Sequence, residues 1–191
     1  LSPEREPDLS YVRSACSTVA SILRPGMFVI LESTTYPGTT EEVMIPLLER
    51  SGLVQGKDFG VAYSPERIDP GSQSYRLEQI PKVIGGMDPD ATWIASEIYR
   101  TIIPEIIPVE NPRIAEATKM MENISRNVNI ALVNEMALIF ERMEIDVWEV
   151  IRAASTKPFG FMPFYPGPGV GGHCIPLDPF YLAYKAKRHG F

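Results

Sequence analysis

The sequence predicts an α/β protein: a doubly wound sheet followed by an all-α part built on one long helix. In the first part of the chain, short continuous apolar runs alternate with amphipathic helical patterns, as strands and helices do in a doubly wound sheet. Residues 113–143 contain neither glycine nor proline, and Ala, Met, Glu and Leu dominate them. We therefore expect an α/β domain over residues 1–110 and a helical domain over residues 111–191.

The predicted elements follow one another at ordinary spacing. Asp8 or Ser10 can cap a helix over residues 9–23, which ends at Pro25-Gly26. The run Met27–Leu31 is continuously apolar, which is typical of a parallel strand covered on both faces. The pattern then predicts a helix over 39–50, strands at 59–63 and 82–85, a helix over 89–102, a strand at 106–109, and helices over 113–143, 146–154 and 180–188. The long helix should measure about 45 Å and bridge two domains or subunits.

Composition and charge restrict the function classes. The chain has 191 residues and is 45% hydrophobic, which fits a globular protein with a real core. Its net charge of −6 argues against nucleic acid as a partner, and no apolar run approaches the ~20 residues that span a membrane. Cys16 and Cys174 lie far apart, so we expect free thiols in a reducing, cytoplasmic compartment. Cys16 lies on the apolar face of its helix and should belong to the core.

Polar residues follow two of the predicted strands. Ser33 and Thr34 come after the first strand, and Glu66 and Arg67 come after the second. In open α/β sheets, ligands bind beyond the carboxyl ends of the strands, so Thr34 and Glu66 should lie on the same edge. One alternative is that Ser33 and Thr34 only cap the helix that follows them. Glu66 could likewise be solvated, or paired with Arg67.

The long helix carries a second polar stripe. Lys119, Asn123 and Asn127 are spaced four residues apart and share one face. If the apolar residues between them are buried, this stripe forms the wall of a cleft. The residues expected to be buried are Met120, Met121, Ile124, Val128 and Ala131. The alternative is a solvated edge of the helix.

A glycine-rich loop near the C-terminus leads into the second cysteine. From residue 167 to residue 179 the chain reads Gly-Pro-Gly-Val-Gly-Gly-His-Cys-Ile-Pro-Leu-Asp-Pro. Glycine lets the backbone pass close to a ligand, so this loop should present Cys174 to a small molecule. Asp178 and Pro179 favour a helix start, where backbone N–H groups favour a thiolate. The pattern indicates a sulfur nucleophile, although most free cysteines are simply packed in a core.

The residues around Cys174 allow three further inferences. Neighbours in an extended loop point apart, so His173 should be poorly placed as a base, and a cysteine hydrolase is the weaker interpretation. His189 is the only other histidine, so a zinc site would lack ligands at any usual spacing and we expect no metal. The aromatic run at 159–165 is interleaved with glycine and proline, and it could close over a ligand.

Together these motifs resemble the UDP-glucose/GDP-mannose dehydrogenase family. Five motifs carry the resemblance, in order and across essentially the whole chain: Arg-Glu-Pro-Asp-Leu-Ser at 5–10, Glu-Ser-Thr-Thr-Tyr-Pro-Gly-Thr-Thr at 32–40, Ser-Pro-Glu-Arg-Ile-Asp-Pro-Gly at 64–71, Lys119 with Asn123, and Gly-Gly-His-Cys-Ile-Pro-Leu-Asp-Pro at 171–179. Within the family the chain is most similar to the UDP-N-acetylhexosamine 6-dehydrogenases, the UDP-N-acetylglucosamine type in particular. Leu177 stands where the UDP-glucose enzymes usually carry a lysine, which weighs against UDP-glucose.

The resemblance implies an NAD-dependent oxidation of the C6 alcohol of a UDP-sugar to a carboxylate, through a covalent intermediate on Cys174. It implies that Lys119 and Asn123 stabilise the developing oxyanion and that Glu66 is the acid/base. Thr34 and Asp178 would hold the hydrolytic water. The resemblance also implies contacts to NAD from Ser33, Thr34 and Glu66. The implied substrate contacts are Arg67, Asn127, Phe161, Phe164, Tyr165 and Gly171.

The chain also departs from the family pattern. Family members begin with a strand and a Gly-x-Gly-x-x-Gly turn that holds the NAD pyrophosphate, and no predicted strand is followed by such a turn here. They continue into a domain that contributes to uridine diphosphate binding, whereas this chain stops at Phe191. We therefore expect a piece of a longer enzyme: an incomplete Rossmann-like sheet, then a central domain that forms a homodimer through helix 113–143. The alternatives are a non-catalytic dimerisation fragment, or a UDP-N-acetylmannosamine or UDP-glucose dehydrogenase.

Overall fold

The computed structural model of the chain describes residue 1, residues 6–68 and residues 75–191. The first residue of the motif at 5–10, and the last part of the motif at 64–71, lie outside the described residues. The chain forms two compact units, one from Leu1–Met120 with Phe180–Phe191 and the other from Met121–Pro179. This division falls inside the long helix, and the domain boundary near residue 110 stays a prediction.

The first unit is built on a four-stranded sheet, which agrees with the predicted α/β class. Its order is β1 (Phe28–Leu31), β2 (Gly60–Tyr63), β3 (Lys82–Gly86) and β4 (Ile106–Val109). The pairs β1–β2 and β3–β4 are parallel, whereas β2 and β3 are antiparallel. Between β2 and β3 the described residues contain only the short 3-10 helix Leu77–Gln79, and not the α-helix that usually links parallel strands.

The helices largely match the predicted ranges. They are α1 (Ser10–Ile22), α2 (Ile45–Leu48), α3 (Pro89–Arg100), α4 (Pro112–Arg142), α5 (Val147–Ala154) and α6 (Asp178–Arg188). The predicted continuous helix over 39–50 is wrong in one respect. A π-helix at Thr40–Met44, α2 and a 3-10 helix at Glu49–Ser51 follow one another there. Pro46 lies at this change of pitch, and it has no N–H to donate to the preceding turn.

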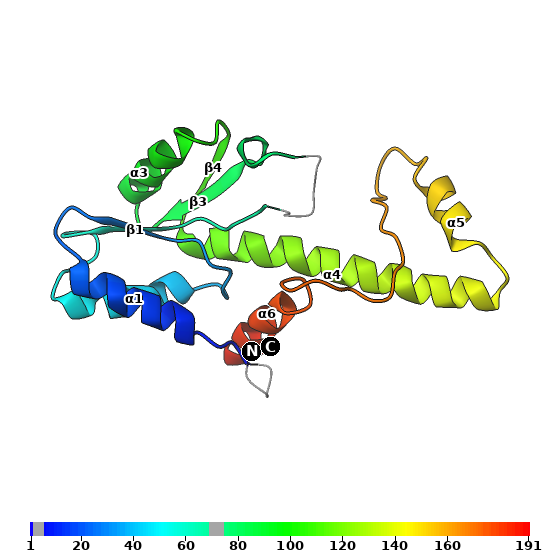
Figure 1. Cartoon of the computed structure of the whole chain (residues 1–191), viewed down its shortest axis with the longest axis horizontal. Coiled ribbons are helices and arrows are strands. Elements are labelled where there is room, and N and C mark those ends of the chain that lie inside the picture. The colour runs from blue at the N-terminus through cyan, green and yellow to red at the C-terminus, as the bar shows by residue number, and fades with distance from the viewer. Residues whose placement is uncertain (2–5, 69–74) are drawn as a thin grey trace. The chain divides into compact units, whose positions relative to one another are not determined.

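Alternating residues of the strands face two different helical layers. Val61 packs with Leu48 of α2 and with Cys16, which confirms the prediction that Cys16 belongs to the core. Ala62, the next residue, packs instead with Ile84 and with Ala95 of α3. Helices α1 and α2 therefore cover one face of the sheet and α3 covers the other (Figure 1). Fully burying such aliphatic side chains contributes about 1.5–3 kcal/mol each.

Strand β1 is less covered than predicted. All four of its residues are half-buried, whereas the last three residues of β2 are fully buried. The continuous apolar run of β1 therefore does not mean that both of its faces are covered within this chain. The difference arises because β1 is an edge strand, paired only with β2.

The second unit contains the rest of α4, the helix α5 and the loop that leads to Cys174. Asp146 caps α5, since its carboxylate accepts the N–H of Trp148 at 2.9 Å. The indole ring of Trp148 stacks on the ring of Tyr165, with centroids 6.2 Å apart. An apolar cavity of about 230 Å³ lies between α4, α5 and the aromatic run, and its lining includes Met136, Phe140, Ile151, Phe161, Met162 and Phe164.

Within the described part of the chain, no helix combines the length and the apolar character needed to cross a membrane.

Gly85 is a packing constraint at the end of β3. A Cβ on this residue would lie 2.3 Å from the carbonyl oxygen of Asn111, directly before α4 begins. We predict that Gly85→Ala lowers the free energy of unfolding by about 1–3 kcal/mol, because backbone atoms must move to admit the methyl group. Urea denaturation measures the change. Gly167→Ala is the control, since a Cβ there has no atom within 4 Å and should change the stability by less than about 0.5 kcal/mol. Equal stability of the two variants would contradict the prediction.

Candidate active site

The carboxyl ends of β1 and β2 lie side by side, as the sequence predicted. Leu31 and Tyr63 are register partners in this parallel pair, and the N–H of Ser64 donates to the carbonyl of Leu31 at 3.0 Å. The residues that follow each strand therefore start from the same edge of the sheet. Glu32 leaves β1 there, and Glu66 leaves β2.

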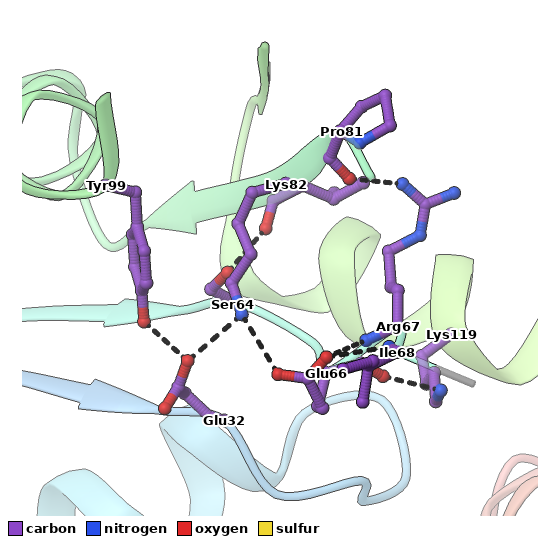
Figure 2. A network of polar contacts seen from close by, with 10 residues as sticks. Glu32, Ser64, Glu66, Arg67, Ile68, Pro81, Lys82, Tyr99 and Lys119 are labelled. Carbon is purple, nitrogen blue, oxygen red and sulfur yellow. Dashed lines mark hydrogen bonds and ion pairs between the residues drawn. The ribbon is translucent and has the colours of Figure 1, made fainter. Parts of the chain in front are cut away.

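Glu66 is held from several sides (Figure 2). Its Oε1 accepts the N–H groups of Arg67 and Ile68, both at 2.7 Å. Its backbone carbonyl accepts a hydrogen bond from Nζ of Lys119, at 2.6 Å. Two residues expected to act in catalysis, 53 positions apart in sequence, thus meet in the first unit. The side chain of Glu66 is nevertheless exposed, as the solvated alternative expects, but its carboxylate is held by backbone N–H groups.

Lys82 forms an ion pair with the Glu66 carboxylate. Its Nζ lies 3.7 Å from Oε2 of Glu66 and 3.0 Å from Oε1 of Glu32. The guanidinium of Arg67 instead donates to the carbonyl of Pro81 at 2.6 Å. The first residue of β3 therefore joins the ends of β1 and β2 through charge (Figure 2).

Tyr99 of α3 completes this network. Its hydroxyl donates to Oε1 of Glu32 at 2.7 Å, and its ring lies 4.9 Å from Nζ of Lys82. Burial, and then the hydrogen bond to Glu32 and its negative charge, raise the pKa of Tyr99 far above its ordinary value. Partial burial acts to raise the pKa of Glu32, but the bonds from Tyr99 and Lys82 and the charge of Lys82 outweigh it and lower that pKa. Tyr99 therefore stays a donor and Glu32 stays an anion near neutral pH.

Glu116 anchors the start of α4 to the turn after β1. Its carboxylate accepts the N–H of Gly38 at 2.5 Å, and it accepts both the N–H and the hydroxyl of Thr40, at 2.9 and 2.7 Å. The side chain is fully buried, and this burial raises its pKa despite the three donors. Because Lys119 follows Glu116 by less than one helical turn, this anchor also fixes the backbone position of Lys119.

The residues between β1 and this turn do not cap a helix. The π-helix at Thr40–Met44 has no side-chain hydrogen bond at its cap, and no side-chain hydrogen bond to another described residue is recorded for Ser33 or Thr34. The capping alternative for these two residues is therefore wrong. Thr35 is fully buried, and its hydroxyl has no hydrogen-bond partner among the described residues.

The second unit brings together another pair of residues expected to act in catalysis. Nδ2 of Asn123 donates to Oδ2 of Asp178 at 2.5 Å, and both side chains are buried. One turn further along α4, Nδ2 of Asn127 donates to the carbonyl of Ile175 at 3.1 Å. Two amides of α4 therefore hold the segment that follows Cys174 in one defined position.

Cys174 is exposed and free, so the alternative of a packed core cysteine is wrong. Its carbonyl accepts the N–H groups of Leu177 and Asp178, at 2.9 and 3.0 Å, which closes a turn before α6. The expectation that His173 points away from it is also wrong. Nδ1 of His173 lies 3.7 Å from Sγ of Cys174, because the loop turns at Gly171 and Gly172, which have φ of +66° and +82°, and is not extended.

The prediction that five apolar residues of α4 are buried is only partly correct. Met120 is buried and Ile124 is half-buried, but Ala131 is exposed, and Met121 and Val128 are 72% and 57% exposed. Helical spacing gives the face on which residues lie, but it does not tell which neighbour covers that face. In the second unit the residues of this chain leave that face of α4 open.

The remaining residues expected to contact substrate lie in separate places. Phe161 and Phe164 line the apolar cavity of the second unit, and Tyr165 stacks on Trp148. Gly171 lies in the glycine turn before Cys174. Their contacts with a sugar nucleotide stay a prediction.

Three residues of the network escaped the sequence analysis: Glu32, Lys82 and Tyr99. Lys82 and Glu32 carry a signal in the sequence, since a charged residue opens an otherwise apolar strand at Lys82 and Glu32 directly follows the first predicted strand. Among the residues that the structure describes, no group of three or more His, Cys, Asp or Glu side chains could hold a metal ion.

Comparison with known proteins identifies the family. Residues 2–103 match the NAD binding domain of the UDP-glucose/GDP-mannose dehydrogenase family, and residues 113–191 match its central domain. The chain therefore belongs to the UDP-glucose/GDP-mannose dehydrogenase family. The UDP-N-acetyl-D-glucosamine 6-dehydrogenase of Pseudomonas aeruginosa is 46% identical to it over 189 residues, which cover 98% of this chain and 44% of that protein.

Other relatives carry a different sugar in their names. The UDP-N-acetyl-D-mannosamine dehydrogenase of Escherichia coli (strain K12) is 42% identical over 186 residues, which cover 94% of this chain and 44% of that protein. The solved structure of UDP-D-ManNAc dehydrogenase from Pyrococcus horikoshii has a TM-score of 0.90 at 44% identity, over 96% of this chain and 44% of that chain. The chain thus spans about 44% of the length of these relatives.

NAD is the cofactor that the match to the NAD binding domain implies. Ser33, Thr34 and Glu66 follow β1 and β2 at the edge where doubly wound sheets bind their ligands, and their oxygens can form hydrogen bonds with a dinucleotide. The residues present are therefore suited to bind part of the NAD molecule. Among the described residues, no strand of this sheet is followed directly by the glycine-rich turn that holds the pyrophosphate in such sheets.

Proposed function

We propose that this chain is part of an NAD-dependent UDP-N-acetylhexosamine 6-dehydrogenase, which oxidises the C6 alcohol of the sugar to a carboxylate. The observation that carries the proposal is the contact between Lys119 and Glu66, in a chain whose family oxidises nucleotide sugars. It joins the helix of the central domain to the carboxyl end of β2, where ligands of α/β sheets bind.

Cys174 is the proposed nucleophile. Its exposed thiol adds to the aldehyde formed by the first oxidation and gives a thiohemiacetal, which cannot diffuse away. Loss of a hydride from this adduct gives a thioester, and water then releases the acid and restores the thiol. NAD⁺, when bound, accepts one hydride in each of the two oxidations. His173, 3.7 Å from the sulfur, can accept the thiol proton as the carbon–sulfur bond forms.

The polar residues have separate proposed roles. Glu66 takes the proton of the C6 hydroxyl during the first oxidation. Lys119 and Asn123 donate hydrogen bonds to the oxygen on which negative charge develops. Thr34 and Asp178 hold the water that attacks the thioester. The buried contact between Asn123 and Asp178 supports the last two assignments, because it fixes the direction of both side chains in the second unit.

The proposed substrate is UDP-N-acetylglucosamine. The relatives named for N-acetylglucosamine and for N-acetylmannosamine have 46% and 42% identity, a narrow margin, so UDP-N-acetylmannosamine is the second candidate. Arg67, Asn127, Gly171 and the aromatic residues Phe161, Phe164 and Tyr165 are the proposed contacts to the sugar nucleotide. The two unpaired cysteines fit a reducing, cytoplasmic compartment, which we also propose.

The proposed reaction has a fixed stoichiometry. In the full-length protein that contains this chain, UDP-N-acetylglucosamine should yield two NADH for each uronic acid formed, and UDP-glucose should react far more slowly. Cys174→Ser should lower the turnover to acid by roughly a thousandfold or more, because the covalent intermediate is lost. Absorbance of NADH and chromatography of the product measure both quantities.

Cys16→Ala is the matched control, because Cys16 is a buried core residue of α1. It should leave the stoichiometry unchanged. The proposed function would be contradicted if the wild-type protein were inactive with every UDP-sugar, or if Cys174→Ser produced the acid at the full rate.

We also propose that a second copy of the chain covers the exposed face of α4. Met121, Val128, Leu132 and Ile139 are all exposed, and their spacings of seven, four and seven residues place them on one face of the helix. An apolar stripe of this form is complementary to itself, as the two-fold interface of a homodimer requires.

Two neighbouring residues of α4 test whether this stripe forms the dimer. Ile139→Asp should weaken the dimer of the full-length protein by roughly a hundredfold or more in Kd, because a carboxylate becomes buried against an apolar stripe. Leu138→Asp is the control, since Leu138 is also exposed but lies about 100° away around the helix. Sedimentation equilibrium measures both. Equal dimerisation of the two variants would show that this stripe is not the interface.

A further inference from the structure

Lys82 is a buried cation that the reaction scheme above does not use. Its side chain is 6% exposed, although lysine almost never becomes buried unless it is paired. It is the first residue of β3 and the register partner of Ile106 in β4, so its backbone is fixed by the pairing of these strands. The position of its ammonium group is therefore set by the fold.

Its neighbours are two carboxylates and one aromatic ring. Oε1 of Glu32 lies 3.0 Å from Nζ of Lys82, and Oε2 of Glu66 lies 3.7 Å from it. The centroid of the Tyr99 ring lies 4.9 Å from Nζ of Lys82, and the face of an aromatic ring attracts a cation. Figure 2 shows the ammonium between the two carboxylates, which reach it from the ends of β1 and β2.

We propose that Lys82 is a positioning residue for the reaction: it holds the carboxylate of Glu66 in place and lies between it and the like charge of Glu32. This inference rests on the proposed role of Glu66 as the acid/base. Oε1 of Glu66 is already occupied by two backbone N–H groups, so Oε2 is the oxygen left to meet a substrate hydroxyl. Lys82 contacts this second oxygen, and the side chain of Glu66 is still 48% exposed, so a substrate can reach it.

The charges around Glu66 determine what removal of Lys82 does. Glu32 faces the same ammonium, Tyr99 is a neutral donor to Glu32, and Lys119 binds only the backbone carbonyl of Glu66. Without Lys82, two carboxylates share this space with no cation between their oxygens. Like charges at close range favour protonation of one of them. A protonated Glu66 cannot accept the proton of the alcohol.

The experiment is the pH dependence of kcat in the full-length protein with UDP-N-acetylglucosamine and NAD⁺. In Lys82→Met, the acid limb of the profile should move to higher pH, and kcat at neutral pH should fall roughly tenfold. KM should change little, because Lys82 is not among the proposed contacts to the substrate. Lys82→Arg should return the limb towards its wild-type position, since it restores the charge.

Glu32→Gln should move the acid limb of the profile in the opposite direction. It removes the competing carboxylate and leaves Lys82 to Glu66 alone, so the acid limb should move to lower pH. Lys57→Met is the control for the loss of a lysine, because Lys57 is exposed and lies on the loop before β2. Its profile should match that of the wild type.

The outcomes separate the two proposals. An inactive wild-type protein contradicts the proposed function itself. If the wild type is active but the acid limb of the kcat profile does not move in Lys82→Met, the role of Lys82 is overturned. The same holds if the acid limb moves in the same direction in Lys82→Met and Glu32→Gln. If Lys82→Met does not fold, the opposite shift in Glu32→Gln and the profile of Lys82→Arg still test the role. A purely structural role would lower activity in all variants without moving the acid limb.

Discussion

The first unit depends on one electrostatic arrangement: a buried ammonium that joins carboxylates from two strand ends. Lys82 contacts both Glu32 and Glu66. Tyr99 of α3 binds Glu32 through its hydroxyl and contacts the ammonium of Lys82 through its ring. A buried cation without these partners would be strongly destabilised, and the carboxylates would lose the charge that draws them together. The sheet order makes the arrangement possible, since β3 lies beside β2 and β2 beside β1.

Helix α4 depends in turn on this edge of the sheet. Glu116 binds the turn that follows β1, and Lys119 binds the backbone at the end of β2. The same helix continues into the second unit, where Asn123 and Asn127 hold the segment around Asp178 and Ile175. One continuous helix therefore supplies polar groups to both units. Its 31 residues suit this role, because neither glycine nor an internal proline interrupts them.

Much of this architecture could be predicted from the sequence, because it rests on local patterns. Apolar runs gave the strands, helix-favouring residues gave α4, and the glycine loop pointed to Cys174. The network around Lys82 could not be predicted, because it depends on which strands become neighbours and on the antiparallel step between β2 and β3. The exposure of Met121 and Val128 escaped prediction for a similar reason, since periodicity does not reveal what covers a face.

The central claim is that Cys174 carries the substrate covalently between two oxidations. The direct measurement is mass spectrometry of the full-length protein, quenched with acid during turnover of UDP-N-acetylglucosamine with NAD⁺. Asp178→Asn should slow hydrolysis of the thioester and let the adduct accumulate. The account predicts a mass increase equal to that of the UDP-sugar uronic acid less one water, as for a thioester, located on the peptide that contains Cys174. Continued formation of the uronic acid with no adduct on that peptide, or with an adduct on another residue, would contradict it.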